Sequence, residues 1–324
     1  MISIIIPTYN SGETLIKALA SVYKNSFKDF EVIVVDDASN DNTHELVKNY
    51  PVRYLLLKSN NGAAFARNRG AELAKGEILL FLDADVEVEE DLLSKVSELF
   101  RVSDYDAISG VFAKESKKGN VFEYFASTLG HYGFSKTNFV FSSHLAAVKR
   151  NVFGDLGGFN ECYKGATVED DEFSHRLIAS GYKGKTDMSM IAYHNHIFTF
   201  YSLFRRWFIF GLLKTPIMLR YGNSLNIRNQ KQRYLVNSFY ILSNILIALL
   251  LFVIPLVFFF HCGSIFLIWL ALYFLVKSEY LLSLRKRRLQ IFILLFITDI
   301  VVLTGCLIGA TKYYYGKYVS KNYK

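Results

Sequence analysis

Two carboxylates follow an apolar run near residue 80, and their spacing suits a metal ion. Residues 78–82 are all apolar, and Asp83 and Asp85 stand two positions apart directly after them. A buried parallel strand presents side chains in this way at the carboxyl edge of a sheet, where ligands bind. In an extended chain both acids would face one hard cation, Mg²⁺ or Mn²⁺, which would hold a diphosphate. Alternatively, the triplet only starts a turn and caps a helix whose first turn holds the acidic residues 89–91.

A second acidic group opens a predicted helix. The four carboxylates of residues 169–172 are followed by Phe173, Leu177 and Ile178 at helical spacing. Carboxylates stabilise the amino end of a helix, which is one sufficient explanation. The other is that Asp170 or a neighbour is a general base, because crowded carboxylates raise the proton affinity of at least one of them.

Two histidines stand on one side of a predicted strand. His194 and His196 are two residues apart in the run Tyr-His-Asn-His. This spacing can bind a metal or a diphosphate, and histidines in strands also serve structural roles.

A parallel sheet is the element that would bring these residues together. Four short apolar runs, residues 2–6, 31–35, 53–57 and 78–82, alternate with helical patterns, and the first run stops at Pro7. Alternating strands and helices predict an α/β fold of the Rossmann-like kind, with a mostly parallel sheet and helices on both faces. We expect Gly76 to end the helix before the fourth strand. Neither a GxGxxG nor a GxxxxGK[ST] loop is present, so phosphate binding would depend on a metal.

Charge divides the chain into two halves. Before residue 197 there are 21 Lys and Arg against 27 Asp and Glu, and from residue 197 onward there are 16 against 2. A positive charge placed among apolar segments predicts attraction to a membrane surface and argues against nucleic acid as a partner. Three scattered cysteines suggest neither disulfides nor a zinc site, and no signal peptide is recognisable, so we expect the first half to lie in the cytosol.

The second half carries the segments that could enter a membrane. Residues 197–233 are aromatic and basic, which predicts helices lying in the interface or, alternatively, an amphipathic helix that covers the catalytic domain. Residues 234–311 are a transmembrane region with two or three helices, built from apolar runs at 235–260, 264–276 and 291–310, and a basic tail occupies 312–324. A third crossing would leave that tail outside, against the positive-inside tendency. Asp299 needs a partner or water there, and it could also contact an acceptor.

The motifs of the first half resemble those of the family-two inverting glycosyltransferases of GT-A fold. Five blocks match in order and spacing: residues 4–10 (IIIPTYN), 34–39 (VVDDAS), Asn61-Gly62 with 66–68 (ARN), 81–85 (FLDAD), and Glu169-Asp170 with Arg176-Leu177. They cover roughly the first 185 residues, which makes residues 1–196 the expected catalytic domain.

The resemblance implies a role for each matched residue. A nucleotide-diphosphosugar donor, linked to UDP or GDP, would bind with Pro7 and Tyr9 lining its nucleoside pocket and Asp37 on the base or ribose. Asp83 and Asp85, with Mg²⁺ or Mn²⁺ and His194 as a further candidate ligand, would hold the diphosphate beside Ala84. Asp170 would be the catalytic base. Asn61 and Arg67 are further donor-site candidates, although Arg67 could instead be a solvated charge on a helix.

Three functions follow from this resemblance. The first is a cell-membrane, multi-pass inverting glycosyltransferase that transfers one sugar to a lipid-linked or membrane-surface acceptor from the cytoplasmic side. The second is a processive polysaccharide synthase; such enzymes carry Gln-x-x-Arg-Trp after the base, whereas residues 203–207 here read LFRRW, without the glutamine. The third is a non-catalytic, membrane-tethered protein that binds nucleotide sugars.

Overall fold

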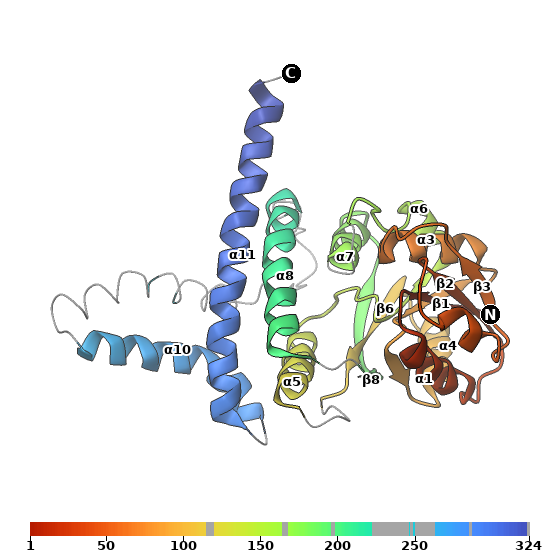
Figure 1. Cartoon of the computed structure of the whole chain (residues 1–324), viewed down its shortest axis with the longest axis horizontal. Coiled ribbons are helices and arrows are strands. Elements are labelled where there is room, and N and C mark those ends of the chain that lie inside the picture. The colour runs from red at the N-terminus through yellow and green to blue at the C-terminus, as the bar shows by residue number, and fades with distance from the viewer. Residues whose placement is uncertain are drawn as a thin grey trace. The chain divides into compact units, whose positions relative to one another are not determined.

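The computed structural model describes residues 1–114, 120–163, 168–195, 198–221, 246, 249, 263–284 and 287–322 (Figure 1). It divides the chain into two compact units, of which the first holds residues 1–118 and 137–197 and the second holds 119–136 and 198–324. The first unit contains the whole sheet, and the elements described in the second unit are all helices. No sequence pattern predicted that residues 119–136 group with the carboxyl-terminal helices.

Eight strands form one mixed sheet in the order β3-β2-β1-β4-β7-β6-β8-β5. Strands β1, β2, β3 and β4 are parallel, as predicted, whereas β7 is antiparallel to both of its neighbours, and β5 is antiparallel to β8. The α/β fold with a partly parallel sheet is therefore confirmed. The strands are β1 Ile2–Thr8, β2 Phe30–Asp36, β3 Arg53–Leu56, β4 Ile78–Leu82, β5 Val86–Val88, β6 Ala107–Phe112, β7 Leu145–Lys149 and β8 Gly184–His194.

Helices cover both faces of the parallel part of this sheet. Leu15, Leu19 and Val22 of α1 are buried in the cluster that contains Ile4 and Ile6 of β1. The intervening Ile5 points the other way, and α3 approaches it so closely that a Cβ on Gly70 would lie 2.5 Å from its Cγ2. The helices of the first unit are α1 Gly12–Tyr23, α2 Thr43–Val47, α3 Ala63–Leu73, α4 Leu92–Val102, α6 Arg150–Asp155 and α7 Glu169–Ala179.

Two boundaries differ from the sequence-based expectation for packing reasons. Strand β1 continues through Pro7, which lies opposite Val35 of β2. The missing N–H is tolerated there because pairing of β1 with β4 already ends at Ile5. Gly76 does not end α3, which stops at Leu73; instead Gly76 lies against β1, where its N–H donates to Ser3 Oγ at 2.8 Å.

Four further elements have bounds that the sequence patterns did not indicate. Strand β7 begins at Leu145, and helix α4 begins at Leu92, after the short strand β5. Helix α5 is Val121–Ser135. The predicted strand that carries His194 is confirmed as the end of β8, which begins at Gly184.

The second unit combines α5 with three long apolar helices. These are α8 Phe200–Tyr221, α10 Gly263–Ser283 and α11 Arg288–Asn322, and α8 lies alongside α11 in Figure 1. At Gly211, Gly305 and Gly309 an added Cβ would lie 2.3–2.5 Å from a backbone oxygen of the facing helix, so α8 and α11 touch through their backbones. Helix α10 continues through Lys277, well past the end of the predicted apolar run at residue 276. The predicted span at residues 235–260 lies almost entirely outside the described residues.

Candidate active site

The loops after β1 and β2 are joined to one another by side-chain to backbone hydrogen bonds. The Asn10 N–H donates to Ser39 Oγ at 2.9 Å, and the Asn40 N–H donates to Asn10 Oδ1 at 2.7 Å. Asn10 and Ala38 have positive φ angles of 49° and 65°, which these bonds hold in place. Tyr9, on the first loop, is 45% exposed. The loops form a fixed rim at the carboxyl end of the parallel strands.

Asp37 fixes the start of the next helix. Its Oδ1 accepts the backbone N–H of Asn61 at 2.9 Å, and its Oδ2 accepts that of Gly62 at 2.7 Å. Gly62 needs its φ of 95° to turn the chain into α3. The neighbouring Asp36 caps its own loop by accepting the Ser39 N–H at 2.7 Å. Asp37 and Asn61 thus lie side by side, because the Asp37 carboxylate accepts hydrogen bonds from the backbone of the loop that carries Asn61.

The segment that carries Asp83 and Asp85 is a turn and not an extended strand. The Val86 N–H donates to the Asp83 carbonyl at 3.1 Å, which reverses the chain between β4 and β5. The assumption of an extended chain was therefore wrong. Of the alternative, the turn is confirmed, whereas the cap is not, because α4 begins after Asp91. Ala84, between the two acids, is 7% exposed and packs in the hydrophobic core, so only its backbone faces the site.

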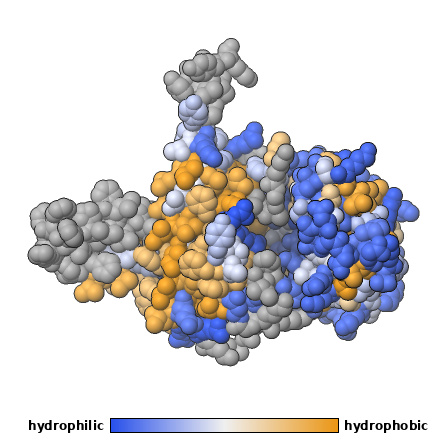
Figure 2. All heavy atoms as spheres, viewed as in Figure 1, coloured by the Kyte–Doolittle hydropathy of each residue, from blue (hydrophilic) through white to orange (hydrophobic). Residues whose placement is uncertain are grey.

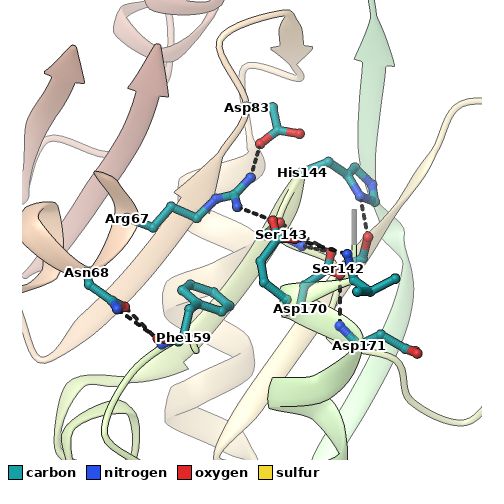
Figure 3. Close-up of polar contacts among 11 residues, drawn as sticks. Arg67, Asn68, Asp83, Ser142, Ser143, His144, Phe159, Asp170 and Asp171 are labelled. Carbon is teal, nitrogen blue, oxygen red and sulfur yellow. Dashed lines mark hydrogen bonds and ion pairs between the residues drawn. The ribbon is translucent and has the colours of Figure 1, made fainter. Parts of the chain in front are cut away.

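Arg67 links Asp83 to the start of α7. Its Nη2 donates to Asp83 Oδ1 at 2.8 Å and its Nη1 to Glu169 Oε1 at 2.7 Å. The side chain is 2% exposed, so the alternative that Arg67 is a solvated charge is wrong. Figure 3 shows the guanidinium lying between Asp83 and the residues around Asp170. Residues far apart in sequence therefore form one charged cluster.

Asp170 is held by donors from its own helix and from the loop before β7. Its Oδ1 accepts the Asp171 N–H at 2.8 Å, and its Oδ2 accepts the N–H and the hydroxyl of Ser143 at 3.1 and 3.2 Å (Figure 3). An ionised carboxylate offers about four acceptor positions, so three bonds orient it and leave one position for a further donor. An acceptor hydroxyl could occupy that position.

Two imidazoles lie beside the other carboxylates. His194 Nε2 lies 3.4 Å from Asp85 Oδ2. His144, whose Nδ1 shares a hydrogen bond of 2.7 Å with Ser142 Oγ, stacks on Phe112 with ring centroids 3.7 Å apart. The ring of His194 meets the same Phe112 edge-on at 5.5 Å. Phe112 thus separates and positions both imidazoles, while His196 lies outside the described residues.

The surroundings shift the pKa values of the two principal acids in opposite directions. Burial works against ionisation of Asp83, but the Arg67 guanidinium outweighs it and holds the pKa of that carboxyl below its ordinary value. Burial, together with the neighbouring Glu169 carboxylate, raises the pKa of Asp170 to about 7, against the hydrogen bond from Ser143 and the charge of Arg67. One acid is thereby kept ionised, and the other is kept near the pH at which a base can exchange protons.

One stretch of the chain is similar to a known family. Residues 3–157 match the family model described as Glycosyl transferase family 2. This matched stretch covers just under half of the chain and includes every strand of the sheet up to β7 together with Asp37, Arg67, Asp83 and Asp85.

Curated relatives are similar to this stretch in sequence, and a solved structure shares its fold. The chain is 26% identical over 204 residues to Glycosyltransferase GlyG of Streptococcus pneumoniae, covering 56% of this chain and 66% of GlyG. It is 37% identical over 127 residues to Poly(ribitol-phosphate) beta-N-acetylglucosaminyltransferase TarP of Staphylococcus aureus, covering 37% of this chain and 39% of TarP. The chain thus spans less than two thirds of the length of either relative. The mannosyltransferase PcManGT of Pyrobaculum calidifontis, solved with GDP-Man and Mn²⁺, shares the fold with a TM-score of 0.58 at 18% identity, over 95% of this chain and 86% of PcManGT.

The carboxylates of the site fit a divalent cation that also binds a substrate phosphate. Among the residues that the structure describes, no group of three or more His, Cys, Asp or Glu side chains could hold a metal alone. Mg²⁺ sites of nucleotide enzymes use one or two carboxylates and complete the shell with phosphate and water. Asp83 and Asp85 supply the carboxylate oxygens for that arrangement: His194 lies 3.4 Å from Asp85 and also acts electrostatically on Asp83, so the three side chains belong to the same region of the site.

Several residues of the site received no role, or only part of their role, from the sequence. Glu169 stood among the four acids and in a matched motif, but its pairing with Arg67 was not expected, and Ser143, His144 and Phe112 received no role. Asn68 and Arg176 belong to matched motifs and prove to hold the turn at Gly157 and Gly158: Asn68 bonds both backbone groups of Phe159 at 2.8 Å, and Arg176 Nη2 donates to the Gly158 carbonyl at 2.7 Å. For Arg67 alone among these contacts the sequence holds a signal of burial, because its small neighbours place it on the buried face of α3.

Proposed function

We propose that this protein is a membrane-associated, inverting glycosyltransferase that transfers a single sugar from a nucleotide-diphosphosugar to a hydroxyl group of a lipid-linked or membrane-surface acceptor. The observation that carries the proposal is the cluster in which Arg67 joins Asp83 to the helix start that bears Asp170. The carboxylate suited to the donor's diphosphate and the carboxylate suited to deprotonating an acceptor thus belong to one site.

The geometry supports a one-step displacement. Asp170 accepts the proton of the acceptor hydroxyl through its remaining acceptor position, and the hydroxyl oxygen forms a bond to the anomeric carbon. The bond from that carbon to the diphosphate oxygen breaks with its electron pair on the leaving nucleoside diphosphate, and the configuration inverts. A divalent cation held by Asp83 and Asp85 would stabilise the negative charge of the leaving group. Asp37, Asn61, Pro7 and Tyr9 lie at the strand ends and loops where the nucleoside would bind.

The raised pKa of Asp170 supports a hydroxyl acceptor. A phosphate acceptor is already ionised and needs no base, whereas a sugar or glycerol hydroxyl must lose its proton in the transition state. A carboxyl whose pKa is about 7 is matched to that transfer at neutral pH. Both UDP- and GDP-linked donors are compatible with the fold, since TarS of S. aureus was solved with UDP-GlcNAc and PcManGT with GDP-Man.

The second unit supports attachment to a membrane. Within the described residues one helix, over Arg288–Tyr315, is long and apolar enough to cross a bilayer. Figure 2 shows apolar residues gathered over this part of the molecule. We propose that the catalytic domain faces the cytoplasm and that the acceptor is presented at the membrane surface.

A single-sugar transfer is favoured over polymer synthesis by one position. Where processive synthases of this family carry a glutamine, Leu203 stands here, and it is 1% exposed in an apolar cluster with Phe125 and Tyr280. At the position of the motif's glutamine, this protein therefore has an apolar packing residue.

The test is to incubate membranes that contain the protein with Mn²⁺ and a panel of labelled UDP- and GDP-sugars. We expect release of the nucleoside diphosphate and transfer of one label to the lipid phase, and a drop of about 10²–10⁴-fold in turnover for Asp170→Asn. Asp187→Asn is the matched control, because Asp187 bonds Ser189 and Lys185 on β8, outside the site. Full turnover by Asp170→Asn would remove the proposed base, absence of release with every donor would favour a binding protein, and long products would favour a processive synthase.

A further inference from the structure

Arg67 is almost completely buried, although a direct contact with a substrate would not require such burial. Its side chain is 2% exposed, and Glu169 is equally buried. The guanidinium carbon lies 5.8 Å from the centroid of the Phe159 ring, which covers one of its faces. Both terminal nitrogens are engaged by carboxylates, one on each side of the site. The group is thus enclosed between the donor side and the base side.

The helix that carries Arg67 is built to bring it there. The buried residues of α3 are Ala64, Ala66, Arg67, Asn68 and Gly70, and small side chains let the helix approach the sheet. The next residue, Asn68, bonds both the N–H and the carbonyl of Phe159. Asn68 therefore holds the chain at Phe159, and its neighbour Arg67 holds it at Glu169. These two points lie before and after the segment that leads into α7, the helix of the base.

The charges around Asp170 show what Arg67 contributes. Glu169 and Asp171, from its own helix, raise the pKa of Asp170, and Arg67 is the positive charge that lowers it. Beyond Arg67, on the Asp83 side, the charges of His144 and His194 also favour the ionised carboxylate. One guanidinium thus acts on both acids at once.

We propose that Arg67 is a positioning residue that holds Asp83 and, through Glu169, the amino end of α7 in one fixed arrangement, so that the metal-binding carboxylate and the catalytic base are set relative to each other. This inference rests on the proposed function. It assigns Arg67 to the link between two acids, in place of the donor contact that the family resemblance implied.

A lysine could not reproduce this link. The two bonds come from two nitrogens of one planar, rigid group, whereas an ammonium is a point charge on a flexible stem. Arg67→Lys therefore keeps the charge and loses the geometry, and Arg67→Met loses both. Glu169→Gln keeps an oxygen that can accept the bond from Arg67 and loses only the negative charge beside Asp170.

The experiment measures kcat and KM for the donor, the Mn²⁺ concentration for half-maximal rate, and the pH dependence of kcat/KM, on the full-length protein in membranes. The variants are Arg67→Lys, Arg67→Met and Glu169→Gln. Arg69→Met is the matched control: Arg69 is on the same helix and pairs with Glu72 and Glu161, but 34% of its side chain is exposed. Thermal unfolding of each variant reports on the folded fraction, and activity of the wild type establishes the proposed function separately.

We expect Arg67→Lys and Arg67→Met to lower kcat by about 10- to 100-fold, as is typical when a group that orients metal-binding carboxylates is replaced. Arg67→Met should also require more Mn²⁺ and move the acidic limb of the pH profile to higher pH, whereas Glu169→Gln should move that limb to lower pH. Opposite shifts would not arise from a general loss of folded protein. Two results for Arg67→Met would overturn the inference while leaving the transferase activity in place. The first is a kcat and a pH profile equal to those of the wild type. The second is a loss of rate that the unfolded fraction explains entirely, with the acidic limb of the pH profile unmoved.

Discussion

At the scale of single residues, the site depends on the balance of forces on Asp170. Its burial and the Glu169 carboxylate favour the protonated form, and the donors of Ser143 and the charge of Arg67 favour the ionised form. The result is a pKa of about 7, a value at which the group can both accept a proton and release it near neutral pH. Asp83 differs because Arg67 bonds it directly and keeps it ionised.

These opposite shifts predict the pH dependence of the activity. A raised pKa means that Asp170 is protonated below about pH 7 and cannot then accept the proton of an acceptor hydroxyl, so kcat/KM should fall about tenfold per pH unit below that value. Asp83 stays ionised over the same range, so loss of the metal-binding carboxylate does not account for the fall. The measurement is the initial rate between pH 5.5 and 8.5 at saturating Mn²⁺. A rate that stays flat from pH 5.5 to 8.5 would show that no base with this pKa acts in the reaction.

At the scale of elements, the turn between α6 and α7 shows how separate segments are joined. Gly157 and Gly158 both have positive φ angles, of 73° and 70°. A Cβ on Gly158 would lie 2.7 Å from Asn68 Oδ1, whereas a Cβ on Gly157 would meet nothing within 4 Å. Asn68 of α3 and Arg176 of α7 both bond the backbone of this turn. The turn therefore connects the helix of Arg67 to the helix of Asp170.

The two glycines allow a controlled test of that connection. Gly157→Ala should cost about 1 kcal/mol of unfolding free energy from the positive φ alone. Gly158→Ala should cost about 2–4 kcal/mol, because the clash with Asn68 is added to the same backbone strain. Thermal unfolding of the purified protein in detergent measures both.

A double variant isolates the contact. Asn68→Ala combined with Gly158→Ala should cost less than the sum of the single changes, because the side chain that Gly158→Ala displaces is already absent. Equal costs for Gly157→Ala and Gly158→Ala would mean that the turn yields freely and does not clamp the two helices.

The strands and the principal acids could be predicted from sequence because local patterns encode them. Residues 78–82 form β4 as expected, and Asp83 follows at its carboxyl end. The antiparallel strand β7 was not predictable as such, because the direction of a strand between two neighbours depends on pairing with residues far away along the chain. Strand β5 has only three residues, too few for a periodic pattern. The turn at Asp83 likewise depends on the position of β5.

The link through Arg67 escaped prediction for a similar reason. Its partner Glu169 is 102 residues away, and nothing in the local pattern pairs them. An arginine on a helix is ordinarily solvated, so the small neighbours Ala64, Ala66 and Gly70 were the only indication that its face is buried. The site was therefore predictable as a set of acids but not as a connected network.

At the scale of the whole molecule, the chain divides its charge and its apolar surface between two units. The second unit exposes large apolar side chains along α10 and α11, among them Leu275 at 67%, Ile293 at 50% and Leu307 at 58%. Its charged residues behave differently, since Lys277 and Asp299 are buried and paired at 2.7 Å, with Tyr273 donating to the same carboxylate at 2.8 Å. The partner that the sequence required for Asp299 is thus found, and a contact with an acceptor stays a prediction. Apolar residues outside and an ion pair inside are the pattern expected in lipid.

This arrangement predicts how the protein resists extraction from membranes. If α11 crosses the bilayer, the protein should remain in the membrane fraction after washes with high salt and with alkaline carbonate. Ile300, near the middle of the apolar segment Arg288–Tyr315, is 38% exposed, and Tyr315, at its end, is 72% exposed. Ile300→Asp should weaken insertion by about 2.5–3.5 kcal/mol, because a carboxylate at the centre of a membrane helix has no water, whereas Tyr315→Asp lies at the interface and should have little effect. The fraction of protein retained after each wash measures the difference. Release of the wild type by carbonate, or equal retention of both variants, would mean that α11 packs within the protein and does not span lipid.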